Sequence, residues 1–139
     1  MKNAILTGVG LAGGAIASIF GGWSASLSTL LIFMGIDYLT GWIVATVFHK
    51  SPKTSSGGYE SRTGFKGLIR KGMILLFVLI GHRLDVAMGM AYIRDAICIA
   101  FMANELMSIV ENAGLMGLPI PKVITDGMEM LKQQADHKE

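Results

Sequence analysis

The chain has 139 residues, of which 52% are apolar and 16% are charged, and its formal net charge is +2. The length indicates one domain, and because a soluble domain usually has about 25% charged residues, the composition indicates an integral membrane protein. The helical spans described below make the expected fold all-α. The sequence has one cysteine, Cys98, and no metal-ligand spacing, phosphate-binding loop or nucleophile motif. We therefore expect no intrachain disulfide, no enzyme activity, no metal or cofactor, and no nucleic-acid partner.

The N-terminal stretch predicts a first membrane span over about residues 5–22. No charged residue occurs from Asn3 to Ile36, which is enough chain for one span, a turn and most of a second. A secretory signal peptide is the competing interpretation, but the apolar run is long and few positive charges precede it. Small residues recur at every fourth position, either by chance or as a helix-packing face: Gly10, Gly14, Ser18 and Gly22.

The second predicted span, residues 26–48, carries one carboxylate, Asp37, near its middle. Ionising a carboxylate at the bilayer centre costs about 2.5 to 3.5 kcal/mol, so Asp37 needs a protein partner, water or a proton. Thr40 and Gly41 share its helix face, where Thr40 can hydrogen-bond and Gly41 leaves room for another helix. Asp37 therefore makes either a structural contact inside a bundle or a functional one that senses protons or faces a lumen.

Residues 49–71 predict a basic cytoplasmic loop. Six cations there face one acid, Glu60, and the positive-inside rule places such a loop in the cytoplasm. We interpret the cations as determinants of topology rather than as a nucleic-acid or headgroup site: Lys50, Lys53, Arg62, Lys66, Arg70 and Lys71.

Two further spans are predicted over residues 69–88 and 95–113. The third carries Asp85 near its far end, and a hydrophobic hairpin that enters and returns is its alternative. The fourth has one polar face at helical spacing, formed by Asn104, Glu105, Ser108, Glu111 and Asn112. Glu111 and Asn112 lie either in the bundle or at the headgroups, which would leave Glu105 as its only deep charge.

Glycine and proline in residues 114–121 end the fourth span, and a short amphipathic helix is expected after Pro121. That helix would lie on the membrane or pack on a neighbouring subunit. The expected organisation is a transmembrane domain, residues 1–114, and a cytoplasmic tail, residues 115–139. About four spans with both termini in the cytoplasm satisfy the charge rule, whereas three would move one terminus outside.

Several blocks in order resemble the phage-lysis and toxin-secretion holin family of bacteria and their phages. They cover most of the chain from Ile32 to Leu131 and comprise residues 37–41 (DYLTG), 53–56, 63–68 (TGFKGL), Arg70-Lys71, Asp85, Arg94, 103–105 (ANE), 108–112 (SIVEN) and 117–121 (GLPIP).

The resemblance implies a small protein that oligomerises with itself in the bacterial cytoplasmic membrane and opens lesions at a set time. These lesions release an endolysin, without any need to bind it directly, or a toxin in relatives. A polar face with Asp37 and Glu105 is costly in lipid, and assembly could relieve the cost by pairing between subunits or by lining water. The alternatives are a non-lytic channel or transporter subunit and an antiholin.

Overall fold

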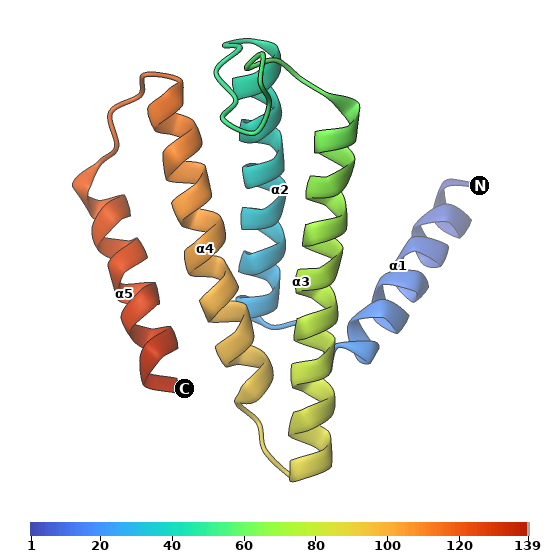
Figure 1. Cartoon of the computed structure of the whole chain (residues 1–139). Coiled ribbons are helices and arrows are strands. Elements are labelled where there is room, and N and C mark those ends of the chain that lie inside the picture. The colour runs from blue at the N-terminus through green and yellow to red at the C-terminus, as the bar shows by residue number, and fades with distance from the viewer. Residues whose placement is uncertain (139) are drawn as a thin grey trace.

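The computed structural model describes residues 1–138, with side chains through residue 136, and the regular secondary structure in this part of the chain is all α-helix. Five helices follow one another: α1 (Lys2–Ile19), α2 (Ala25–Thr46), α3 (Ser61–Met88), α4 (Ile93–Leu115) and α5 (Lys122–Lys138) (Figure 1). The all-α prediction is confirmed.

The helix ends follow from local sequence. Ser24 begins α2 because its hydroxyl accepts a hydrogen bond from the Leu27 N–H at 3.1 Å, which satisfies one free donor of the first turn. Gly89 ends α3 in the left-handed conformation, with φ of +65°. Pro119 and Pro121 separate α4 from α5, since proline cannot continue a helix.

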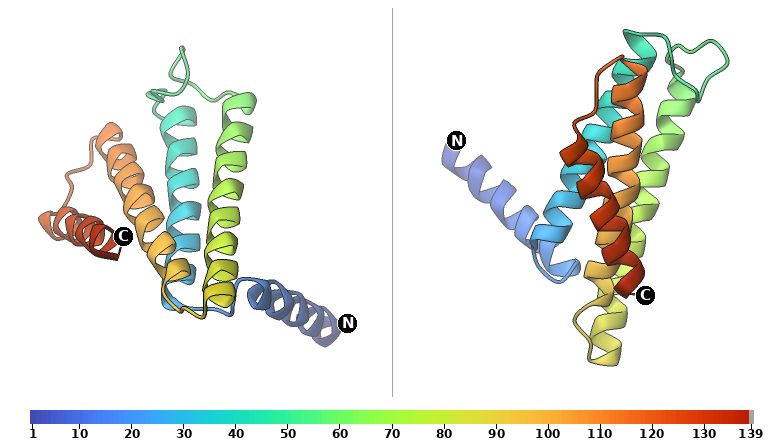
Figure 2. Two further views of the ribbon diagram at one scale, coloured as in Figure 1. Left: turned by 60° about the horizontal axis from the view of Figure 1, so that its bottom comes forward. Right: turned by 90° about the vertical axis from the view of Figure 1, so that its left-hand side faces the viewer.

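The bundle is organised around α4, which packs against α2, α3 and α5, while α2 and α3 touch each other little (Figures 1 and 2). Its apolar core lies between α2, α3, α4 and α5 and includes Leu27, Leu30, Val78, Cys98 and Ala135. In both figures α1 projects away from the bundle, and its apolar side chains are exposed.

Two helices, α1 and α2, are long and apolar enough to cross a membrane. α3 and α4 have 28 and 23 residues, which is also sufficient length, but α3 contains Lys71, Arg83 and Asp85, and α4 contains Glu105 and Glu111. The number of spans therefore stays a prediction.

The structure corrects two expectations about residues 49–88. The predicted basic loop ends at Glu60, because α3 begins at Ser61 and carries Arg62, Lys66, Arg70 and Lys71 on a helix. The alternative of a hydrophobic hairpin is wrong, since α3 continues without a break to Met88.

The tail differs as well. The amphipathic helix predicted after Pro121 exists as α5, but it folds back along α4 of its own chain (Figure 2). Leu131 and Ala135 join the core there, because they form the apolar side of α5.

Candidate functional site

A buried ion triple joins the three central helices. The Lys71 ammonium of α3 donates to Asp37 Oδ2 of α2 and to Glu105 Oε2 of α4, both at 2.7 Å. The side chains of Lys71, Asp37 and Glu105 are 15%, 11% and 7% exposed. Two carboxylates share one cation, so the ionised cluster keeps one negative charge in excess. Removing such charges from water is costly unless they are paired, and the geometry supplies that pairing.

An amide and a hydroxyl extend the triple along α2 and α4. The Asn112 amide donates to Thr40 Oγ1 at 2.9 Å and to Asp37 Oδ1 at 3.3 Å. Gly41 lies next to this amide, and a side chain there would place its first carbon at an ordinary van der Waals distance of 3.8 Å from the amide nitrogen. Asn112 therefore fixes the second oxygen of Asp37 while Lys71 holds the first.

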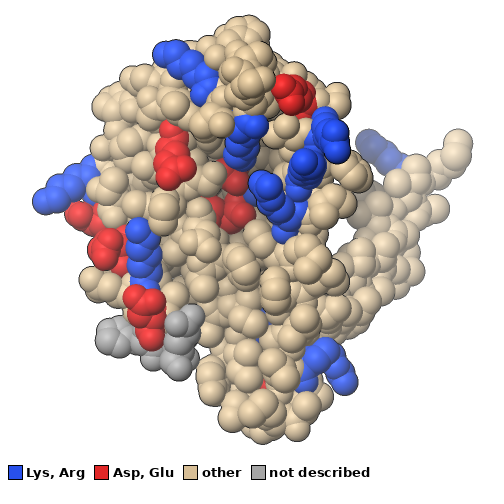
Figure 3. All heavy atoms as spheres, in the orientation of Figure 1, with Lys and Arg blue, Asp and Glu red and all other residues tan. Residues whose placement is uncertain are grey.

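A cavity of about 300 Å³ opens beside the triple. α2, α3 and α4 form its walls, and residues 51–54 and 58–60 of the connection between α2 and α3 contribute its outer rim. Figure 3 shows this side of the molecule, where Lys and Arg side chains gather around a hollow in which acidic atoms are visible. The cavity exists because α2 and α3 are separated here, whereas each packs closely on α4.

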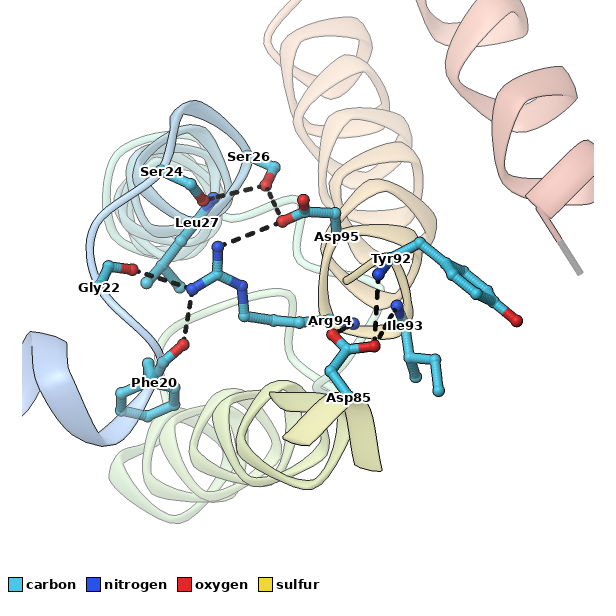
Figure 4. A network of polar contacts seen from close by, with 10 residues as sticks. All are labelled: Phe20, Gly22, Ser24, Ser26, Leu27, Asp85, Tyr92, Ile93, Arg94 and Asp95. Atoms are coloured by element: carbon cyan, nitrogen blue, oxygen red, sulfur yellow. Dashed lines mark hydrogen bonds and ion pairs between the residues drawn. The ribbon is translucent and has the colours of Figure 1, made fainter. Parts of the chain in front are cut away.

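A second polar network ties the two connections at the opposite end of the bundle (Figure 4). The Asp85 carboxylate accepts the N–H groups of Tyr92, Ile93 and Arg94 at 3.3, 2.9 and 3.1 Å, which satisfies the free donors at the start of α4. These contacts make Asp85 a cap for the next helix rather than a member of the ion triple.

The Arg94 guanidinium in the same network holds the connection between α1 and α2. It donates to the carbonyls of Phe20 and Gly22 at 2.6 and 2.9 Å and pairs with Asp95 at 3.4 Å (Figure 4). Asp95 in turn accepts a hydrogen bond from Ser26 at 2.8 Å. Cations favour the carbonyl end of a helix, so Arg94 stabilises the end of α1.

Comparison with known proteins shows the family of this chain. Residues 14–133 match the bacteriophage holin family. The chain belongs to that family. The resemblance predicted from the sequence is thereby confirmed, and membership implies a membrane protein, with which the two long apolar helices agree.

Relatives of this holin-family chain occur in bacteria and in a phage. An uncharacterized protein of Halalkalibacterium halodurans is 38% identical over 124 residues, covering 85% of this chain and 86% of the relative. An uncharacterized 14.9 kDa protein of Clostridium perfringens is 34% identical over 134 residues, covering 95% and 96%. A protein of Bacillus phage phi105 named "Probable holin" is 31% identical over 113 residues, covering 81% and 78%. No solved structure matches.

The structure of this holin-family chain brings most of the predicted polar residues of α2 and α4 together. The ion triple, its hydrogen-bond partners and the cavity wall contain Asp37, Thr40, Gly41, Asn104, Glu105, Ser108 and Asn112. Of the two positions left open, Asn112 lies in the bundle, whereas Glu111 is exposed and points away from it. Their functional roles stay predictions.

Other predicted residues lie elsewhere. Gly22 is outside α1, which ends at Ile19, and a side chain added at Gly10, Gly14 or Gly22 would meet nothing within 4 Å. The small-residue face of α1, including the exposed Ser18, therefore has no partner within the described chain. Among the cations, Lys53 and Arg70 line the cavity, whereas Lys50, Arg62 and Lys66 are exposed away from it.

The sequence interpretation missed the role of Lys71. It was assigned to the cytoplasmic end of the third span, yet its ammonium reaches inward to both buried acids. A signal was present: Lys71 directly precedes the apolar run from Gly72 to Ile80, and two acids with no assigned partner lay in neighbouring spans. The interpretation considered the charge of one segment by itself and did not consider ion pairs between helices.

Proposed function

We propose that this protein is a holin that oligomerises in the bacterial cytoplasmic membrane and opens lesions that release an endolysin. The observation that carries the proposal is membership of the bacteriophage holin family, together with the likeness to the "Probable holin" of phage phi105. Toxin release is the corresponding activity where a large toxin is the cargo. Four spans with both termini in the cytoplasm give the arrangement in which the basic α2–α3 connection also lies inside.

The ion triple supports a closed state that can accumulate without damage. Asp37 and Glu105 share a cation within their own chain, so a single copy already offsets part of the cost of their burial without a neighbour. This changes the earlier hypothesis, in which pairing between subunits relieved the cost. On assembly, the ion pairs that already exist within each chain would instead be replaced by new contacts.

Opening would separate α3 from α2. These helices make few direct contacts, and two of their links are polar: Lys71 with Asp37, and the Tyr38 hydroxyl with the Gly64 carbonyl at 3.3 Å. A lesion lined by the freed acids and by Asn104, Ser108 and Asn112 would present polar groups to water. Moving one charge across the membrane is worth about 2.3 kcal/mol per 100 mV, so loss of potential would bias the exchange.

The test is induced expression in bacteria with a cytoplasmic endolysin that lacks its own export signal. We expect a sudden loss of membrane potential and viability, with lysis only when the endolysin is present. Sustained growth would contradict the proposal and favour an antiholin. A slow ion leak without enzyme release would contradict it as well and favour a channel subunit.

The triple has its own test in the same cells. Asp37→Asn and Glu105→Gln should each change the time of lysis, because each alters the pairs that must exchange. Arg83→Gln is the control, since Arg83 is exposed on α3 and remote from the cavity. If both acid variants kept the wild-type timing, the role of the triple in opening would be wrong even if lesions form.

A further inference from the structure

Two tyrosines and two glycines form part of the wall of the cavity beside the ion triple. Tyr38 and Tyr59 lie against α3 where it carries Gly64 and Gly67: a side chain at Gly64 would come within 3.0 Å of the Tyr59 hydroxyl and 3.3 Å of the Tyr38 hydroxyl. At Gly67 the added carbon would contact the Tyr38 ring at 3.7 Å. Glycine at position 64 therefore lets both aromatic side chains occupy the wall, whereas the contact at position 67 is an ordinary van der Waals distance.

The rim over the cavity is ordered by its own hydrogen bonds. The Thr54 hydroxyl donates to the Gly58 carbonyl at 2.7 Å, and the Ser51 N–H donates to the Gly57 carbonyl at 2.9 Å. Gly57 has φ of +76°, and a side chain there would collide with the His49 carbonyl. The connection thus holds one shape, and a ligand would enter a largely preformed site.

Charge in the cavity is separated along its depth. The buried floor has Asp37 and Glu105 against Lys71, which leaves one negative charge in excess. The exposed rim has Lys53 and Arg70 against Glu60, which leaves one positive charge in excess. A cation should prefer the floor and an anion the rim.

The aromatic residues in the cavity wall indicate which class of ligand the cavity can bind. Tyr38, Trp42 and Tyr59 line the cavity, and aromatic faces together with carboxylates recognise organic ammonium groups. Arginine beside an opening recognises phosphate. Trp42 is 46% exposed and continues the outer apolar surface of α2, which fits contact with acyl chains.

We propose that this cavity binds the headgroup of a zwitterionic phospholipid, with the ammonium toward Asp37 and Glu105 and the phosphate toward Arg70 and Lys53. The ligand chemistry is an ammonium joined to a phosphate, which a soluble phosphoethanolamine would share with a lipid. The site goes beyond lesion formation, and its test measures binding alone, so it stands or falls separately from the lytic function.

The test is thermal unfolding of the full-length protein purified in a maltoside detergent. Short-chain phosphatidylethanolamine, phosphatidylglycerol and diacylglycerol are titrated in parallel with soluble phosphoethanolamine. We expect phosphatidylethanolamine to raise the melting temperature saturably and the other two lipids to leave it unchanged. Stabilisation by a ligand that binds the folded state grows with its concentration over Kd, so the titration gives an apparent affinity.

Rim variants locate the effect. Arg70→Gln and Tyr59→Leu should each weaken the apparent affinity for phosphatidylethanolamine by about tenfold or more, because each removes a recognition group. Both side chains are exposed, so the fold should tolerate the changes; Lys53→Gln replaces either variant if it does not fold. Arg83→Gln, exposed on α3 and distant from the cavity, should bind like the wild type.

Each outcome decides the proposal. If phosphoethanolamine alone reproduces the stabilisation with the same sensitivity to Arg70→Gln, the site is supported and its ligand is soluble. If phosphatidylglycerol stabilises equally, or if the rim variants keep the wild-type affinity, the proposal is overturned. Absence of any response to phosphatidylethanolamine and phosphoethanolamine overturns it too.

Discussion

At the scale of single residues, one cation, Lys71, compensates the buried negative charge inside the bundle. Lys71 reaches two carboxylates from helices on either side, and the flexible lysine stem allows its ammonium to lie between them at equal distance. The site therefore depends on Lys71 more than on either acid, because loss of the lysine leaves two uncompensated charges.

The first prediction is that Lys71→Met destabilises the protein by about 3 to 5 kcal/mol, the usual cost of removing one partner from a buried pair. The free energy of unfolding can be measured by titrating a denaturing detergent into micelles. Combining it with Asp37→Asn and Glu105→Gln should recover most of the loss, because no charge then remains buried. A Lys71→Met variant as stable as the exposed-site control Arg83→Gln would contradict this.

Gly81 allows α3 to pack closely against α4. A side chain at Gly81 would come within 2.7 Å of Ile97 Cδ1 and 3.1 Å of the Arg94 Cα, so backbone as well as side chain must move. We predict that Gly81→Ala destabilises the protein by about 1 to 3 kcal/mol through overpacking. Gly72→Ala on the same helix meets nothing and should be neutral or stabilising. Equal unfolding free energies for the two variants would show that α3 and α4 do not approach this closely.

At the scale of elements, Asp85 shows how one helix fixes the start of the next. It lies in the last turn of α3, yet its carboxylate accepts three N–H groups at the start of α4. The connection of residues 89–92 is therefore held by a side chain that precedes it.

We predict that Asp85→Ala costs about 1 to 2 kcal/mol, the range for loss of a helix cap. Asp85→Asn should fall between alanine and wild type, because the amide oxygen still accepts but the favourable charge near the helix start is lost. Hydrogen exchange at Tyr92, Ile93 and Arg94 should accelerate in both variants. Glu129→Ala, an exposed acid on α5, is the control, and unchanged exchange at the three amides would refute the cap.

The helices themselves could be predicted from the sequence, because each is long and the connections between them contain glycine, proline or serine. The start of α3 could not, since residues 61–71 are as basic as the preceding loop and charge alone does not separate a polar helical turn from a loop. The polar faces around Asp37 and Glu105 were readable from helical spacing. Their joint partner was not, because spacing within one helix carries no information about the register between helices.

At the scale of the whole molecule, the apolar outer surfaces of α1, α2 and α3 indicate what must surround the protein. Large side chains such as Ile5, Leu39 and Phe77 are about half or more exposed, and a patch of this extent needs lipid or another protein to cover it. In Figure 1 the chain end before α1 and the α2–α3 connection lie toward one end of the structure, and the α1–α2 and α3–α4 connections lie toward the other.

Four spans predict that these two ends face opposite sides of the membrane. In a Cys98→Ser background, Ser56→Cys should react with an impermeant maleimide only after the cells are opened. Met90→Cys, at the other end, should react in intact cells. Labelling of both positions from the same side would contradict the four-span topology and would favour the three-span alternative.

The position of α5 relative to the bilayer follows from the same topology. In this structure Ala135 of α5 lines a pocket together with Ala100 and Ala103 of α4, yet residues 122–136 of α5 also include five charged ones: Lys122, Asp126, Glu129, Lys132 and Asp136. Each would cost about 2.5 to 3.5 kcal/mol near the bilayer centre. If α4 spans the membrane, α5 should turn away from it to the surface about the connection at residues 116–121.

Disulfide cross-linking separates the two arrangements. In the Cys98→Ser background, Ala103→Cys with Ala135→Cys should cross-link in detergent solution, where water reaches the polar side of α5, but not in intact membranes. Ser26→Cys with Asp95→Cys is the matched pair, because their hydrogen bond joins α2 to α4 in either medium, and it should cross-link in both. Equal cross-linking of the α4–α5 pair in membranes would mean that α5 stays on α4 and that its charges find water there, which a fully lipid-surrounded α4 does not allow.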